Sequence, residues 1–380
     1  MRRPAGAPPE ARGLARDGVR LLVATPDGVL HARFSDLPGY LAPGDLLVVN
    51  TSATVAAAVP GRRGDGRPVL VHWSGRLADG TWLVELRTGE PALGRVTDAA
   101  AGDTVSLPGD ATVTLLHAFP GHGLAGQGQA GSRMWAAAAA GDVAALEARH
   151  GRPVRYGYVP EPWPLSAYQT VFARSPGSAE MPSAARPFTP ELVTDLISAG
   201  VLLATVTLHA GVASLETGEA PLPEWFSVPP ATADLVNVTR AAGRRVVAVG
   251  TTSTRALESA AAAGGRVRAS SGLTELVIGP ARPARVVTGL ITGWHDEGAS
   301  HLDLLTAVAG ADLVKAAYQA AEQAGYLWHE FGDSCLLLPS GQGARRAASP
   351  GAGRRPRSVD NHRPVFEDAT VPRHVSLEAD

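Results

Sequence analysis

The residues best suited to bind a polar ligand lie where a predicted strand runs into a predicted helix, at positions 246–258. This segment reads VVAVGTTSTRALE, so four consecutive hydroxyl residues, Thr251 to Thr254, follow Gly250 and precede Arg255. Free backbone N–H groups at a helix N-terminus favour anions or carbonyl oxygens, and hydroxyls add donors and acceptors. Helix capping explains one of the hydroxyls, but four in a row after a glycine exceed what a cap needs. The pattern predicts a ligand site formed by Gly250, Thr251, Thr252, Ser253 and Arg255.

Two histidines follow predicted strands and are candidates for proton transfer. His209 ends the apolar segment VLLATVTLHAG at 201–211, and His295 follows VVTGLIT with Asp296 beside it. An imidazole can act as acid or base near neutral pH, so we predict that His295 transfers protons or hydrogen-bonds a substrate. For His209, a structural role and a catalytic role are equally expected. A histidine beside acidic residues could also bind a metal, but no second pair at a fixed spacing supports that alternative.

A polar segment at 168–189 reads YQTVFARSPGSAEMPSAARPFT and leads into a helix that Thr189 is expected to cap. Small residues and hydroxyls at this density let a backbone approach a ligand closely. Read alone, such a segment is more often a surface loop. Near the end of the chain, FGDS at 331–334 is ordinarily a turn, although Asp333 could also present a carboxylate to a site.

The order of predicted elements indicates an α/β domain interrupted by a smaller β domain. After position 189, apolar strands alternate with helices, which is typical of a layered α/β domain with a mostly parallel sheet. From 59 to 117, short β-forming segments alternate with Gly, Asp and Pro, which predicts a small antiparallel β-barrel. We expect residues 1–58 and 152–338 to form the catalytic α/β domain, 59–151 the inserted barrel domain with a connecting helix, and 339–380 a disordered Arg/Gly/Pro-rich tail.

Four local assignments follow from the same pattern. We expect one helix over 135–151, one helix over about 302–324, a strand in LTELVIGP at 273–280 and a closing strand over 326–338.

The composition of the chain excludes several kinds of protein and of binding site. The formal net charge is −2, so any contact with nucleic acid must come from a local basic patch. The single cysteine, Cys335, permits no internal disulfide and no cysteine-based metal site. No apolar run reaches the length of a bilayer span and the N-terminus lacks the apolar segment of a secretory signal, so we expect a cytoplasmic protein. No GxxxxGK[ST] segment is present, which excludes a P-loop for nucleoside triphosphates.

Several segments resemble, in the same order along the chain, the S-adenosylmethionine:tRNA ribosyltransferase-isomerases, which make epoxyqueuosine in the tRNA anticodon. The matching segments are PGDLLVVNTSA (43–53), YQTVFA with GS (168–178), TLHAG (207–211), EWFSV (224–228), VVAVGTTSTRALE (246–258) and FGDS (331–334). No single segment is decisive, but their shared order makes the resemblance specific. It spans about residues 15–338.

The resemblance implies an α/β catalytic domain with an inserted β-barrel and S-adenosylmethionine (SAM) as a ribosyl donor. In the implied reaction, an aminomethyl-deazaguanine at the tRNA wobble position attacks through its amine. A base removes a proton beside the sulfonium, and adenine and methionine leave. We therefore expect a monomer whose partners are SAM, as a substrate, and a tRNA anticodon loop, with no metal and no prosthetic group.

The resemblance also implies roles for particular residues. Catalytic roles fall on His209, His295 and Glu224. Substrate-binding roles fall on the hydroxyl turn at 250–255 and on Tyr168, Gln169, Thr170, Ser178, Ser183, Phe188, Thr189 and Asp333.

The chain departs from the family pattern in four places near these residues, at Ser166 and Ala167, at Pro187, at 213–223 and at DEGASH (296–301). Pro187 stands where the family usually has a histidine, and residues 213–223 lack the family's further histidines and methionine. Two alternatives therefore stay open: a SAM-dependent transferase acting on a non-tRNA acceptor, and a non-catalytic SAM- or RNA-binding paralogue.

Overall fold

The computed structural model of the chain describes residues 3–89, 94–119, 132–212, 221–296 and 300–339. All of them belong to one unit that spans residues 1–347. The tail predicted from position 339 lies, apart from Pro339, outside the described residues.

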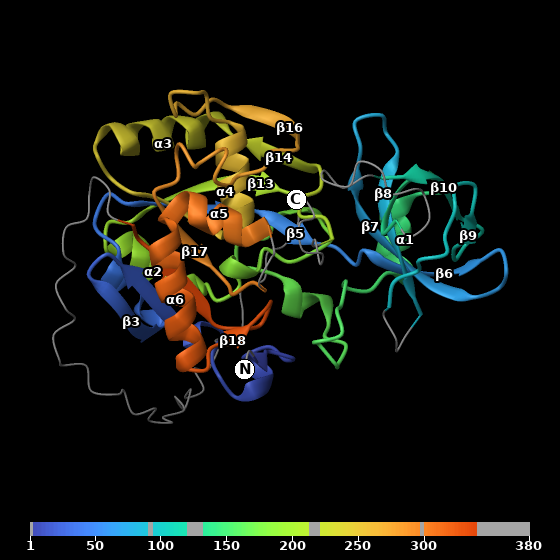
Figure 1. The fold of residues 1–380 in the computed structure, drawn as a ribbon, viewed down its shortest axis with the longest axis horizontal. Coiled ribbons are helices and arrows are strands. Elements are labelled where there is room, and N and C mark those ends of the chain that lie inside the picture. Colours follow the sequence, from blue (N-terminus) through green and yellow to red (C-terminus); the bar gives the residue numbers. More distant parts are fainter. Residues whose placement is uncertain (1–2, 90–93, 120–131, 213–220, 297–299, 340–380) are drawn as a thin grey trace, which may run out of the picture. The chain divides into compact units, whose positions relative to one another are not determined.

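A nine-stranded mixed sheet organises the α/β part of the chain (Figure 1). Its strands in spatial order are β16 (Ser270–Thr274), β14 (Glu224–Val228), β13 (Leu202–Leu208), β4 (Leu46–Asn50), β15 (Val246–Val249), β17 (Gly289–Thr292), β19 (Ser334–Leu337), β2 (Arg20–Thr25) and β3 (Gly28–Arg33). Strands β13, β4, β15 and β17 run parallel to one another, so their carboxyl ends meet at one edge of the sheet. Strands β16, β14 and β3 pair antiparallel with their neighbours, and β19 runs antiparallel to β17 but parallel to β2.

Strand β4 shows why helices cover both faces of this sheet. Its side chains alternate, with Leu46 and Val48 in one buried hydrophobic core and Leu47 and Val49 in another. Successive strand residues point to opposite faces, so each face needs an apolar cover. The first core receives residues of α3 (Pro230–Ala241), α4 (Gly250–Ser259), α5 (Ser300–Ala309) and α6 (Ala311–Gln323), and the second those of α2 (Pro190–Ser198). The result is a layered α/β arrangement.

Six antiparallel strands form a closed barrel between β5 and β12 in the chain. They are β6 (Ala58–Arg63), β7 (Pro68–Arg76), β8 (Trp82–Thr88), β9 (Thr104–Ser106), β10 (Thr112–Ala118) and β11 (Met134–Ala140), in the spatial order β10-β11-β8-β7-β6-β9. A separate hydrophobic core fills this part and includes Val71, Trp73, Val84 and Trp135. Helix α1 (Val143–His150) follows and is capped by Asp142, whose carboxylate accepts a hydrogen bond from Ala145 N.

Short elements complete the fold. Two-stranded pairs join β1 (Arg3–Pro4) to β18 (Leu327–Trp328) and β5 (Ser52–Thr54) to β12 (Ser175–Ser178). The 3₁₀ helices are η1 (Glu10–Arg12), η2 (Arg16–Gly18), η3 (Phe34–Tyr40), η4 (Leu165–Tyr168) and η5 (Ser183–Ala185).

The predicted fold class, an α/β domain with a small antiparallel barrel, is confirmed. All four local assignments were wrong in whole or in part, in two cases because tertiary pairing or a glycine overrides the pattern. The alanine run at 134–140 is strand β11, because it pairs with β8 and β10, and Gly141 at φ +128° separates it from α1. Gly310, at φ +84°, divides the predicted helix at 302–324 into α5 and α6. The predicted closing strand is divided into β18 and β19, and β16 ends at Thr274, so only the first two residues of LTELVIGP are in a strand.

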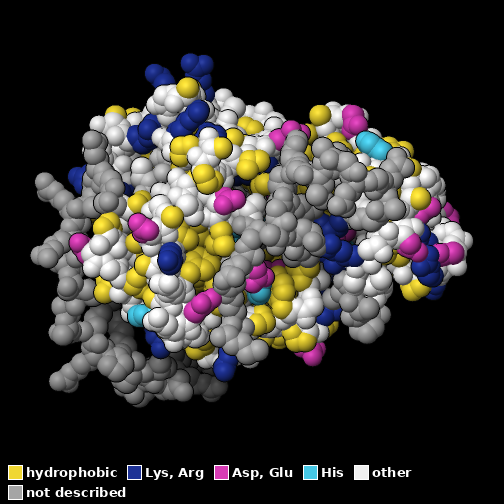
Figure 2. Space-filling model, viewed as in Figure 1, with side chains coloured by type: hydrophobic (Ala, Val, Ile, Leu, Met, Phe, Trp, Pro, Cys, Tyr) yellow, Lys and Arg dark blue, Asp and Glu magenta, His cyan; other side chains and the backbone are white. Residues whose placement is uncertain are grey.

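The domain boundaries at residues 59 and 151 stay a prediction. Among the described residues we find no helix with the length and hydrophobicity needed to cross a bilayer. Figure 2 shows acidic and basic side chains mixed over one face, in keeping with the formal net charge of −2.

Candidate active site

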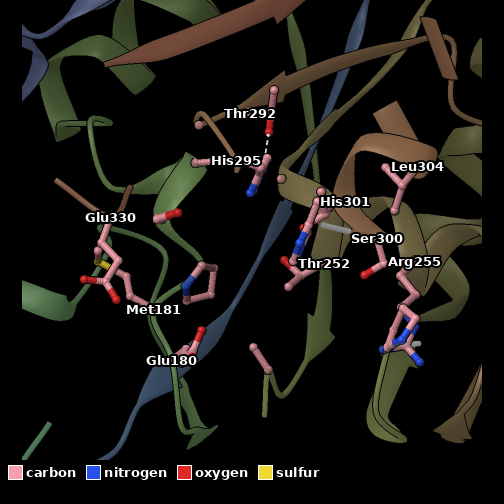
Figure 3. A pocket seen from close by; sticks show the side chains of 18 of the residues that line it. Glu180, Met181, Thr252, Arg255, Thr292, His295, Ser300, His301, Leu304 and Glu330 are labelled. Carbon is pink, nitrogen blue, oxygen red and sulfur yellow. Dashed lines mark hydrogen bonds between the residues drawn. The ribbon is translucent and has the colours of Figure 1, made fainter. Parts of the chain in front are cut away.

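A cavity of about 250 Å³ lies at the carboxyl ends of β13, β15 and β17. Segments that follow each of these strands line it, namely 210–212, 250–252 and 292–296. Residues 180–184, 329–330 and the first turn of α5 form further parts of the wall (Figure 3). Ligands of α/β proteins commonly bind outside the carboxyl ends of parallel strands, so this is the candidate active site.

The hydroxyl turn at the start of α4 contributes only part of its side chains to the cavity. Gly250, Thr251 and Thr252 line it, whereas Ser253 and Thr254 are buried within the protein. No side chain caps α4, and Thr252 Oγ1 instead accepts a hydrogen bond of 3.2 Å from Asn50 Nδ2. Gly250 has φ +91°, and a Cβ there would lie 3.4 Å from that of Ala184, so glycine suits both the backbone and the close approach.

Arg255 holds one wall of the cavity together. Its guanidinium donates to Glu224 Oε2 at 2.5 Å and to the carbonyl oxygens of Leu222, Thr274 and Leu276 at 2.8–3.0 Å. Glu224 Oε1 accepts a bond of 3.0 Å from Gly211 N. Arg255 is only 5% exposed, and its fork of donors ties α4 to β14, β16 and the turn after β13.

His295 and His301 form a stacked pair on the same side of the cavity as Thr252 (Figure 3). Their rings lie 4.5 Å apart and are inclined by 3°. His295 Nε2 lies 3.1 Å from Thr292 Oγ1, and its backbone N donates to the Tyr318 hydroxyl. Burial lowers the pKa of both imidazoles, that of His301 to about 4, and each charge would also repel the other cations nearby. Both histidines are therefore neutral at neutral pH.

Two glutamates, Glu180 and Glu330, lie on the opposite side of the cavity from these histidines (Figure 3). The Tyr156 hydroxyl donates to Glu180 Oε1, and the side chain of Tyr158 hydrogen-bonds with Glu330. The Tyr158 ring stacks on that of His329 with centroids 4.1 Å apart. Burial raises the pKa of Glu330 to about 8, and the charge of Glu180 acts in the same direction. The cavity thus has an acidic wall, formed by Glu180 and Glu330, and an imidazole wall, formed by His295 and His301.

His209 lies behind the cavity rather than in its lining. Its Nδ1 is 2.7 Å from Ser52 Oγ, its ring stacks on Trp225 at 5.1 Å, and Gly177 packs against its other side. Ser52 Oγ is also 2.6 Å from Ser178 Oγ, which accepts a bond from Ala210 N. These contacts fix the course of the chain into residues 210–212, so His209 and Ser178 position the wall.

The other predicted binding residues in 168–189 and Asp333 also have partners away from the cavity. Gln169 exchanges two hydrogen bonds with the backbone of Thr54, Thr189 caps α2, and Asp333 binds Arg20. Tyr168 and Phe188 are in hydrophobic cores, and Thr170 accepts a bond from Phe172 N. Ser183 is the one predicted residue of this segment that lines the cavity.

The structure therefore brings together seven of the predicted residues: Ser183, Glu224, Gly250, Thr251, Thr252, Arg255 and His295. The cavity residues that sequence reasoning missed are Tyr158, Glu180, His301, His329 and Glu330. Glu180 lies inside the 168–189 segment and Glu330 directly precedes FGDS, so proximity to those motifs was the available signal.

We expect Gly177→Ala to destabilise the protein by about 1–3 kcal/mol, because the new Cβ has no room. It would lie 2.8 Å from three ring atoms of His209, at a backbone φ of +152°. Thermal unfolding measures the effect. Gly157→Ala is the control, because a Cβ at Gly157 meets nothing within 4 Å. Equal stability of the two variants would show that His209 is not held as described.

We expect acid to destabilise the protein through His301. Its pKa is lowered from 6.5 to about 4, so between these values the unfolded chain binds a proton that the folded protein does not. Stability is then lost as the pH falls from 6.5 towards 4, by about 2–3 kcal/mol at roughly 1.4 kcal/mol per pKa unit. His301→Asn should flatten this part of the stability–pH curve in urea titrations, whereas His150→Asn, at an exposed site, should not.

Within the described part of the chain, no group of three or more His, Cys, Asp and Glu side chains is placed to hold a metal ion. The residues that line the cavity supply imidazoles, carboxyl groups, hydroxyls and backbone donors.

Comparisons with known proteins agree on one family. The profile of the family described as "Queuosine biosynthesis protein" matches residues 2–337. A protein of Acidiphilium cryptum named S-adenosylmethionine:tRNA ribosyltransferase-isomerase is 37% identical over 339 residues, covering 85% of this chain and 93% of that protein. A protein of the same name from Nitrobacter winogradskyi is 34% identical over 358 residues, covering 90% and 97%.

A solved structure is also similar. The crystal structure of the S-adenosylmethionine tRNA ribosyltransferase from Thermotoga maritima covers 89% of this chain and 96% of its own, with 27% identity and a TM-score of 0.45. The profile match over residues 2–337 and the two relatives at 34–37% identity establish the family. The chain belongs to the queuosine biosynthesis protein family.

Proposed function

We propose that this protein transfers the ribosyl moiety of SAM to an aminomethyl-deazaguanine at the wobble position of tRNA and isomerises it to the epoxycyclopentane of epoxyqueuosine. Adenine and methionine are released. SAM is a substrate and no prosthetic group takes part. Family membership and the names of relatives that align over at least 85% of the chain support this proposal.

The observation that carries the proposal is the two-sided cavity at the carboxyl ends of the parallel strands. The reaction brings together a sulfonium, an amine and a purine leaving group. An acidic wall suits the cationic groups, because carboxylates stabilise nearby positive charge. A wall of neutral imidazoles and hydroxyls suits proton transfer and the hydrogen-bonding edges of a purine.

We assign the main proton transfer to His295. Its lowered pKa keeps the ring unprotonated at neutral pH, so it can accept the proton from the carbon beside the sulfonium. The imidazolium formed in this buried position is a strong acid and can pass the same proton to the departing adenine. Thr292, 3.1 Å from Nε2, orients the ring.

Glu224 and His209 act in this account as positioning residues. Both carboxylate oxygens of Glu224 already bind protein donors, Gly211 N and Arg255. His209 lies behind the same turn and binds Ser52. Together they hold residues 210–212 against the bound substrate.

The proposal also covers the acceptor, the oligomeric state and the location of the protein. We propose that the acceptor is the tRNA anticodon loop, that the protein acts as a monomer, and that it works in the cytoplasm, where its tRNA substrate is found. Light scattering at several protein concentrations tests the monomer, and a mass that doubles with concentration would contradict it.

The test of the function is adenine release measured by chromatography. Purified protein is incubated with SAM alone, with SAM and tRNA carrying the aminomethyl-deazaguanine, and with SAM and the same tRNA carrying guanine at that position. We expect adenine only with the aminomethyl-bearing tRNA. Adenine in all three incubations, or SAM binding without adenine in any, would contradict the proposal.

A further inference from the structure

We propose that Glu180 and Glu330 form a binding site for a primary ammonium group of a substrate. The inference rests on the proposed function for the identity of the substrates, but its evidence is the geometry of the acidic wall. Two substrates of the reaction carry such a group: the aminomethyl arm of the acceptor base and the methionine part of SAM.

The two glutamates are held in place by a separate set of aromatic residues. Tyr156 donates to Glu180 Oε1, and the neighbouring Tyr158 hydrogen-bonds with Glu330. The two tyrosine rings are stacked with centroids 5.9 Å apart, and Tyr158 stacks in turn on His329. Both carboxyl groups line the cavity, on the side opposite His295 (Figure 3). The arrangement fixes two acceptors at one wall of a substrate-sized space.

One oxygen of this pair lacks a partner. Glu330 Oε2 is buried and has no hydrogen-bond partner among the described residues. The same part of the chain gives Glu330 no arginine or lysine, since its interactions are with Tyr158 and the like charge of Glu180. A buried acceptor without a donor is costly, and two carboxylates at one wall repel each other. A ligand that donates hydrogen bonds and carries positive charge would pair with the unpartnered oxygen and reduce the repulsion between the two carboxylates.

The chemistry of the partner follows from that requirement. The sulfonium of SAM is positive but has no N–H to donate. A primary ammonium has three donors and one positive charge, so it can satisfy Glu330 Oε2 and still reach Glu180. His329, whose pKa burial lowers, and Asp296, 3.9 Å from His329 Nε2, also lie near this wall, and Arg16 and Arg186 line a small neighbouring pocket with Glu330. Both arginines form ion pairs with Glu10.

Binding an ammonium group changes the protonation of the site. Without ligand, burial and Glu180 raise the pKa of Glu330 to about 8, so at neutral pH Glu330 holds a proton. An ammonium group takes the place of that proton, which leaves to solvent. Once Glu330 is ionised, it is also the group placed to accept a proton from the ammonium when the amine becomes a nucleophile.

The experiment compares binding of ligands with and without the amine, so it needs no turnover. Dissociation constants at pH 8.5 are measured for two matched pairs. The first pair is SAM and its deaminated analogue, which keeps the sulfonium and the carboxylate but lacks the amine. The second is tRNA carrying the aminomethyl-deazaguanine and the same tRNA carrying guanine. The proteins are wild type, Glu330→Gln, Glu180→Gln and the control Glu161→Gln, whose side chain is exposed and outside the cavity.

We expect wild type and Glu161→Gln to prefer the amine-bearing member of one pair, and each cavity variant to lose that preference about 10-fold to 100-fold. The pair that changes identifies which substrate amine binds the site. The inference is overturned if Glu330→Gln keeps the wild-type preference in both pairs, or if the wild type shows no preference in either. Loss of adenine release in the wild type would count against the proposed function but leave this comparison intact. Far-UV circular dichroism confirms that the variants are folded.

Discussion

Arg255→Ala is expected to abolish adenine release and to lower the free energy of unfolding by about 3–5 kcal/mol. The guanidinium is 5% exposed and makes one ion pair and three carbonyl contacts. Its removal leaves Glu224 as a partly buried charge without its cation and three carbonyl oxygens without their donor. Because these groups join α4 to β14 and β16, the cavity wall loses its support along with the stability.

Urea denaturation and the adenine assay measure the two effects separately. Arg268→Ala is the matched control, because Arg268 is exposed near β16 and outside the cavity. Arg255→Lys keeps the charge but not the fork of donors, so it should recover part of the stability and little of the activity. An Arg255→Ala protein with wild-type stability would contradict the role described for this residue.

Glu330→Gln is expected to make the protein more stable at pH 9 while impairing its function. The pKa of Glu330 is raised from 4.5 to about 8, so between these values the folded protein binds a proton that the unfolded chain has lost. Stability contributed by the neutral carboxyl is complete below pH 4.5 and is lost as the pH rises through 8. Above pH 8 the ionised, buried carboxylate destabilises the folded protein and glutamine removes this cost, which is on the order of 5 kcal/mol at about 1.4 kcal/mol per pKa unit.

Thermal unfolding of Glu330→Gln and wild type across pH 5–9 measures the difference, with Glu161→Gln as the exposed control. The two curves should coincide near pH 5 and diverge as the pH rises. A variant that is less stable than wild type at pH 9 would mean that Glu330 is a structural residue. Residues kept at a cost in stability are typical of functional sites.

The sequence predicted those parts of the site whose position depends only on a short local segment of the chain. A strand followed by Gly250 and a run of hydroxyl residues marks a helix N-terminus at the edge of a sheet, and that turn lines the cavity. His295 was found for the same reason, since it follows β17 closely. The positions of both depend on only one strand and the residues after it.

The acidic wall could not be found in this way, because its two glutamates are 150 positions apart in sequence. They come together only in the folded chain, where Tyr156 and Tyr158 hydrogen-bond to them. His209 is the opposite case, because a local pattern suggested a site residue that the fold places outside the cavity lining. Its strand-end position resembles that of His295, but a stack on Trp225 and a bond to Ser52 fix it behind the wall.

The alanine run at 134–140 is another segment whose structure depends on contacts with distant parts of the chain. Alanine favours helix, yet here a strand results because the segment closes the barrel between β8 and β10. Non-local pairing decided the outcome, and no window of sequence contains that information.

The central claim is that ribose carbons of SAM become part of a tRNA base. The most direct measurement is mass spectrometry of nucleosides from tRNA that has been incubated with this protein and SAM labelled with carbon-13 throughout the ribose. The account predicts that the deazaguanine nucleoside gains the mass of the whole labelled ring, with unlabelled adenine and methionine in solution. Label that remains in small molecules, with the tRNA nucleoside unchanged in mass, would contradict it.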